Sequence, residues 1–217
     1  MKLFKMRSLG NLEYVIDIIF NERLYCAHFA DLNDPFEGIY LAGSGLPHGL
    51  PQSDSMSELP VEGRSAPYLH QEFNRICSLS ESFEDVRLWS YYGDGHRGIA
   101  IEVDFHGHEA DVKPIHYMKD FTDYENANSE MPSVDEILSQ KTVHWQYERE
   151  CRIVQPEPFY SIKNRITAIY LGSRISRDRQ ALLEKLVPES IPIHTTKINI
   201  GKLAVEPHDL LARTTRK

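Results

Sequence analysis

The sequence predicts a single α+β domain built on a largely antiparallel β-sheet with flanking helices. Segments with strand character outnumber helical ones, and the two do not alternate in the regular way that produces a parallel sheet. The chain of 217 residues is long enough to bury one core. We therefore expect one domain over residues 1–217, with a flexible loop or lid at about 41–67, where Gly, Pro and Ser are frequent.

Strands are predicted where short apolar or alternating runs lie between turn residues. Alternation in the first run places Lys5 and Arg7 on one face of a strand. The predicted strands cover residues 3–9, 24–30, 76–82, 98–104, 112–118, 150–155, 166–172 and 191–200.

Helices are predicted from apolar spacing and from capping residues. Leu12, Val15, Ile16 and Ile19 recur at helical spacing. Ser133 and Glu136 form a capping-box signature. The predicted helices cover residues 11–24, 68–76, a short segment from 86, 133–141 and 177–187.

Composition and charge exclude several classes of protein. The chain has no apolar run near the length of a membrane-spanning helix, so no membrane partner is expected. Its three cysteines have no CxxC spacing, which favours a reducing, cytoplasmic location. The net charge of −8 argues against broad binding to nucleic acid. His106, His108 and His116 lack the spacing of zinc ligands, so no metal is predicted.

Polar motifs follow one another at predicted strand ends and carry the functional signal. In chain order they are Asn-Asp-Pro-Phe-Glu at 33–37, Ser-x-Ser at 78–80, LWSYYGDGHRGIAIE at 88–102 and K-x3-W-x-YE-x-E-x-RI at 141–153. Together they resemble the bacterial family known as domain of unknown function 2971, over residues 3 to about 172. An arginine, a Ser-x-Ser and a Glu-x-Glu in this order are also similar to the Arg–Ser–Glu class of ADP-ribosyltransferases. That likeness implies a split sheet and NAD as substrate.

The resemblance assigns roles residue by residue. It implies that Arg7 binds the pyrophosphate, that Ser78 and Ser80 form the serine motif, and that Glu150 is the catalytic carboxylate, with Glu148 acting on the acceptor. Aromatic rings that would stack on nicotinamide are Tyr91, Tyr92 and Trp145. Further candidates for the same cleft are Asn33, Asp34, Glu37, Trp89, His96, Arg97, Lys141, Tyr147 and Arg152.

The resemblance implies that the protein transfers ADP-ribose from NAD to a macromolecule, either a nucleic acid or a protein. It also implies a role as a toxin or in phage defence, with a possible antitoxin or regulatory partner. Two alternatives stay open. One is a phosphodiesterase or nuclease that uses His96, Arg97, Lys141 and Glu150. The other is a non-enzymatic module that binds a nucleotide or a protein.

Each motif also has a purely structural interpretation. Glu148, Glu150 and Arg152 fit the solvated face of a strand whose other face is apolar. Asn-Asp-Pro is a turn signal, and the aromatic residues from Trp89 onward fit a core. The ADP-ribosyltransferase hypothesis requires Arg7, Ser78 and Glu150 to converge on one cleft.

Overall fold

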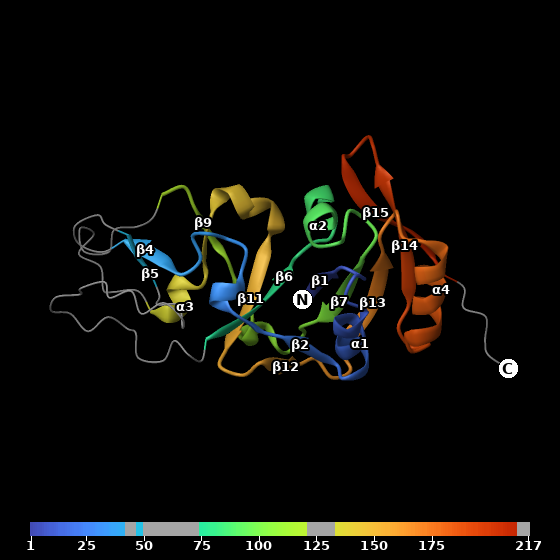
Figure 1. Ribbon diagram of the computed structural model, residues 1–217, viewed down its shortest axis with the longest axis horizontal. Helices are drawn as coiled ribbons and strands as arrows, with labels where there is room; N and C mark the ends of the chain where they lie inside the picture. The colour runs from blue at the N-terminus through green and yellow to red at the C-terminus, as the bar shows by residue number, and fades with distance from the viewer. Residues whose placement is uncertain (42–46, 50–73, 121–132, 212–217) are drawn as a thin grey trace.

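The chain folds around one large β-sheet with helices packed against it. The computed structural model describes residues 1–41, 47–49, 74–120 and 133–211 (Figure 1). The sheet is mostly antiparallel and the described residues form a single domain, which confirms the predicted α+β class. None of the described helices is long and apolar enough to cross a membrane.

The main sheet has nine strands in the order β15-β14-β13-β7-β1-β6-β11-β8, with β3 also paired to β6. Among the strands that the structure describes in this sheet, β13 and β14 are the one parallel pair. Its strands are β1 (Lys2–Arg7), β3 (Ala27–His28), β6 (Arg75–Ser80), β7 (Ile99–Asp104), β8 (Lys113–Pro114), β11 (Glu150–Gln155), β13 (Ile166–Leu171), β14 (Ile193–Asn199) and β15 (Ala204–Leu210).

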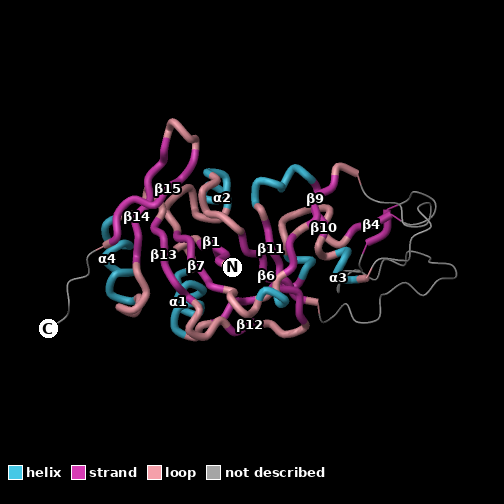
Figure 2. Tube along the Cα trace, turned by 180° about the vertical axis from the view of Figure 1, so that it is seen from behind, coloured by secondary structure: helices cyan, strands magenta, loops and turns pink. Residues whose placement is uncertain are grey.

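Smaller elements surround this sheet, and Figure 2 shows them from the opposite side. The two-stranded sheets are β2 (Arg23–Tyr25) with β12 (Phe159–Ser161), β4 (Ile39–Leu41) with β5 (Pro47–Gly49), and β9 (His116–Met118) with β10 (Gln140–Thr142). The α-helices are α1 (Leu12–Phe20), α2 (Val86–Tyr91), α3 (Val134–Ile137) and α4 (Arg177–Leu186). The 3-10 helices are η1 (Phe29–Asp31), η3 (Glu109–Asp111) and η4 (Val143–Glu148).

One face of the sheet forms the main apolar core. Alternate residues of neighbouring strands point into it, as the period of two in a strand requires. These residues include Leu3, Cys77, Leu79, Ile101, Cys151 and Ile153. Helix α1 covers them with Val15, Ile18 and Ile19, and α4 adds Leu183. Each such fully buried aliphatic side chain contributes roughly 1.5–3 kcal/mol to folding.

The sheet is split between β1 and β6. Strand β1 pairs with β7 at six positions, but it meets β6 at one, Phe4 with Ser80. Farther along β6, its edge pairs instead with β3, at Ala27 with Ile76. The ammonium group of Lys5 reaches across the opening and donates a 2.7 Å hydrogen bond to the carbonyl oxygen of Ser78.

Several predicted boundaries differ from the structure. The helix predicted over 133–141 ends at Ile137, because residues 140–142 pair as β10 with β9. Most of the helix predicted over 68–76 lies outside the described residues, and its last residues belong to β6. The loop or lid predicted at 41–67 also lies outside them, except for the end of β4 and for β5. Strands β12 and β15 were not predicted.

Candidate functional site

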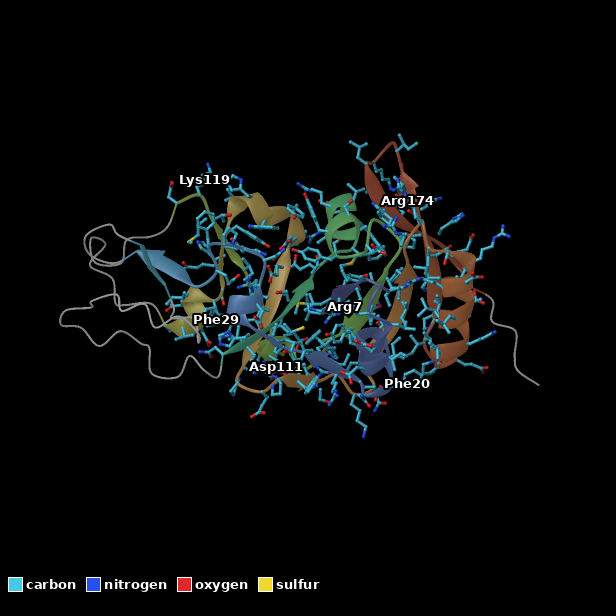
Figure 3. All side chains as sticks on the ribbon, viewed as in Figure 1. Arg7, Phe20, Phe29, Asp111, Lys119 and Arg174 are labelled. Carbon is cyan, nitrogen blue, oxygen red and sulfur yellow. The ribbon has the colours of Figure 1, made fainter. Side chains whose placement is uncertain are left out.

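A cavity of about 370 Å³ lies at the split between β1 and β6. Arg7 of β1, Ser78 of β6 and Glu150 of β11 all line it. The motif residues therefore converge on one cleft, as the ADP-ribosyltransferase hypothesis requires. Figure 3 shows Arg7 near the middle of the molecule, between the ribbons of β6 and α1.

The two glutamates reach the cavity because the backbone turns sharply between them. Arg149 ends η4 in the left-handed conformation, with φ at 45°. A residue with a side chain occupies that region at a cost of about 1–2 kcal/mol. The turn buries Glu148 and Glu150 while Arg149 faces solvent and pairs with Glu81. The hydroxyl of Ser80 lies 2.6 Å from the carbonyl oxygen of Glu148 and so braces the turn.

A buried ionic network connects these glutamates to two cations. The ammonium of Lys141 donates to Glu148 Oε2 at 2.6 Å and to Glu150 Oε2 at 2.8 Å. Arg152 Nε donates to Glu150 Oε1 at 2.7 Å. Its two terminal nitrogens bind both oxygens of Glu37, at 2.6 and 2.8 Å. The network thus holds three carboxylates and two cations.

The motif at 33–37 supplies both a turn and one wall of the cavity. The carboxylate of Asp34 accepts a 2.9 Å hydrogen bond from the backbone NH of Phe36, which is the turn chemistry predicted for Asn-Asp-Pro. Glu37 then binds Arg152. Asn33 donates to the hydroxyl of Tyr92 at 3.1 Å, and that hydroxyl donates to Glu148 Oε1 at 2.6 Å.

The interpretation of this strand as a solvated face is wrong. The side chains of Glu148, Glu150 and Arg152 are only 6%, 4% and 1% exposed. Cys151 and Ile153 point into the apolar core, as that interpretation expected, but the opposite face is covered as well. Buried charges of this kind are tolerated only when they are paired and hydrogen-bonded, and the network provides both.

The pKa values of the two buried glutamates are shifted in opposite directions. Burial alone would raise the pKa of Glu150, but Arg152 and Lys141 outweigh it and lower the pKa to about 2. Burial raises the pKa of Glu148, despite opposing effects from Lys141 and Tyr92. Glu150 therefore stays ionised near neutral pH, whereas Glu148 is the more easily protonated of the pair.

The side of the cavity formed by β1 is cationic. Burial lowers the pKa of both Arg7 and Lys5. The Nε atom of Arg7 is buried, and the described part of the chain offers it no hydrogen-bond acceptor. A buried donor without an acceptor costs free energy, which an anionic ligand in the cavity would recover.

Other predicted site residues lie elsewhere. Trp89 is fully buried and donates from Nε1 to the carbonyl oxygen of Phe83 at 2.6 Å, so it belongs to the core. Tyr91 is 69% exposed on α2 and does not line the cavity. The ring of His96 stacks on that of Trp89, with the ring centres 6.2 Å apart. Arg97 pairs with Asp94 at the surface.

Trp145 and Tyr147 do not line the cavity either. The ammonium of Lys141 lies 4.7 Å from the centre of the Trp145 ring, a cation–π contact. Tyr147 packs under the guanidinium of Arg87, 4.0 Å from its ring centre. Of the three aromatic residues expected to stack on a ligand, only Tyr92 lines the cavity.

Sequence reasoning missed about half of the residues that line the cavity, among them Lys5, Tyr14 and Tyr25. Lys5 shares a strand face with Arg7, and that alternation was a usable signal. Tyr14 of α1 and Tyr25 of β2 also line the cavity, although they are 52% and 42% exposed. Nothing in their local sequence distinguishes them from ordinary surface tyrosines. The described residues contain no group of three or more side chains placed to hold a metal ion.

A scan against protein-family models, a search of curated proteins and a search of solved structures each returned no match to the chain. The resemblance to domain of unknown function 2971 stays a prediction, and so does the ADP-ribosyltransferase likeness.

Proposed function

We propose that the protein is an ADP-ribosyltransferase-like enzyme that transfers ADP-ribose from NAD to a macromolecule. The observation that carries this proposal is the convergence of Arg7, Ser78 and Glu150 on one cavity at the split of the sheet. The three come from different strands, and Arg7 and Glu150 are separated by most of the chain. The nucleic acid or protein acceptor, and any antitoxin or regulatory partner, follow only from the family likeness.

The protonation states suit cleavage of the bond between nicotinamide and ribose. As that bond breaks, positive charge develops on the sugar, as in glycoside hydrolysis. The low pKa of Glu150 keeps its carboxylate ionised to stabilise that charge. Glu148, whose pKa burial raises, is suited to take a proton from the acceptor.

The cationic side of the cavity fits the anionic part of the same substrate. Arg7 has a planar guanidinium whose buried Nε finds no acceptor among the described residues. Such a group binds phosphate oxygens well, because its donors match their geometry. In this proposal Arg7 holds the pyrophosphate and Ser78 contacts the substrate from the neighbouring strand.

Nicotinamide release tests the proposal. Wild-type protein is incubated with NAD labelled in the nicotinamide ring, alone and with RNA, DNA or a protein extract, and free nicotinamide is measured. We expect release from the wild type and a loss of about 100-fold or more in Glu150→Gln, as for removal of one group that stabilises transition-state charge. If the wild type releases no nicotinamide with any acceptor, the proposal fails.

Glu102→Gln is the matched control. Glu102 is also a buried glutamate of the same sheet, and it accepts hydrogen bonds from Lys2, Thr167 and Tyr170, but it does not line the cavity. We expect this variant to keep its activity. Equal loss in both variants would attribute the effect to general damage to the fold.

A nucleotide-binding module without turnover is the second candidate. Each oxygen of Glu150 already accepts a hydrogen bond from a cation, at 2.7 and 2.8 Å, which weakens its attraction for a developing charge. NAD binding with no nicotinamide release would favour this candidate. The nuclease alternative has less support, because His96 and Arg97 lie outside the cavity that Lys141 and Glu150 share.

A further inference from the structure

Two exposed tyrosines line the cavity and have no part in the proposed transfer step. Tyr14 projects from α1 and Tyr25 from β2. Both line the cavity, yet about half of Tyr14 and two fifths of Tyr25 remain exposed, at 52% and 42%. They therefore mark the place where the cavity meets solvent.

The ring of Tyr25 is held by a chain of neighbours. Phe159 meets it edge-on with ring centres 5.7 Å apart. The guanidinium of Arg23 lies over Phe159, 3.7 Å from the ring centre, and also makes hydrogen bonds of 2.8 to 3.1 Å to the carboxylate of Asp17. A fixed aromatic ring loses little conformational entropy when a ligand binds.

Tyr14 and Arg7 line the same cavity, and the two side chains are close enough to interact electrostatically. Arg7 itself lies three residues along β1 from Phe4, which pairs with Ser80, and Ser80 pairs with Glu150. At about 3.3 Å per residue, Arg7 is about 10 Å along the strand from the row that holds Glu150. Tyr14 and Glu150 thus belong to opposite ends of the cavity.

We propose that Tyr14 and Tyr25 form a stacking site for the adenine ring of a nucleoside diphosphate whose phosphates bind Arg7. This inference rests on the proposed function, because Glu150 would engage the ribose next to nicotinamide and so leave the ADP half at the opposite, open end. Flat aromatic faces attract nucleic-acid bases, and phosphate beside them completes the recognition of a nucleotide.

Titration calorimetry with ADP and with inorganic pyrophosphate tests this site. We expect Tyr14→Ala and Tyr25→Ala each to weaken ADP binding by roughly tenfold or more, the usual effect of removing a stacked aromatic residue. Pyrophosphate binding should stay within about twofold of wild type, since it has no ring to stack. Tyr14→Phe and Tyr25→Phe should bind ADP like the wild type.

Tyr91→Ala is the matched control, because Tyr91 is an exposed tyrosine on a helix outside the cavity. The inference is overturned if the wild type binds ADP no more tightly than pyrophosphate, or if the alanine variants bind ADP normally. It is also overturned if they change only the KM of the macromolecular acceptor, which would place the acceptor on these tyrosines.

Failure of this inference and failure of the proposed function are distinguishable. Tyrosine-dependent ADP binding without nicotinamide release would uphold the stacking site and contradict the enzyme. Nicotinamide release with an unchanged KM for NAD in both alanine variants would uphold the enzyme and contradict the stacking site.

Discussion

The two edges of β1 have opposite environments. On one edge, β1 pairs with β7 along its whole length, and the neighbouring side chains Leu3, Ile101 and Val103 pack into the apolar core. On the other edge it meets β6 only at Phe4, and Lys5 and Arg7 line the cavity. One edge of this strand thus continues the sheet, whereas the other edge opens a candidate site.

Polar contacts stabilise the split between β1 and β6. A continuous sheet satisfies its backbone groups within the ladder, whereas a split leaves some of them without strand partners. Here Lys5 supplies a donor to the carbonyl oxygen of Ser78. Beyond β6, one face of β11 packs into the apolar core and the other carries buried ion pairs. The four predictions below probe this difference, from the largest expected effect to the smallest.

Replacing Arg152 should have the largest effect on stability. Arg152→Met leaves Glu150 and Glu37 buried without their guanidinium, and removing one partner of a buried pair costs about 3–5 kcal/mol. The free energy of unfolding in urea measures this cost. Arg149→Met is the control, because Arg149 pairs with Glu81 at the surface, and it should cost about 1 kcal/mol or less. Similar values for the two variants would contradict the structural role of the network.

Lowering the pH should reduce the free energy of unfolding of the wild type more than that of the Glu150→Gln variant. The pKa of Glu150 in the folded protein is about 2, below its ordinary value of 4.5. The stabilisation from the carboxylate is therefore complete above about pH 4.5 and is lost as the pH falls toward 2. The shift corresponds to about 3 kcal/mol. The difference in unfolding free energy between wild type and variant should shrink by about that amount across this window, and a constant difference would contradict the shift.

Removing the bridge across the split should cost less. Lys5→Met keeps most of the length of the side chain but deletes the donor to Ser78, and hydrogen bonds from charged groups contribute about 1.5–3 kcal/mol. Lys2→Met on the same strand is the control, since Lys2 is 57% exposed and Glu102, with which it pairs, keeps its hydrogen bonds from Thr167 and Tyr170. We expect about 1 kcal/mol or less for Lys2→Met. The free energies of unfolding of both variants in urea measure what each lysine contributes to stability at its edge of β1.

The smallest stability effect is expected for Tyr92→Phe, at about 1 kcal/mol, the usual net contribution of one hydrogen bond. The larger effect of this variant is expected on the pH dependence of activity. The Tyr92 hydroxyl lowers the pKa of Glu148, so its loss should raise that pKa further. If Glu148 is the general base, the acidic limb of the kcat/KM profile should move to higher pH. An unmoved limb would assign the proton transfer to another group.

Much of this organisation was predictable from local sequence. The alternation in 3–9 and 150–155 predicted β1 and β11, and helical apolar spacing predicted α1. The capping box at Ser133 is present in the structure, although the helix it begins is shorter than predicted. Those features depend on neighbours within a few residues, which the sequence lists directly.

The order of the motifs can be read from local sequence, and so can the face of the strand from which each polar side chain projects. The burial of Glu148, Glu150 and Arg152 follows from the fold alone, because Glu37, which binds Arg152, is separated from it by 115 residues. The fold also places Tyr14 and Tyr25 at the cavity, whereas Tyr91 and Trp145 lie outside it. Burial depends on what a fold places above a side chain, and no local pattern encodes it.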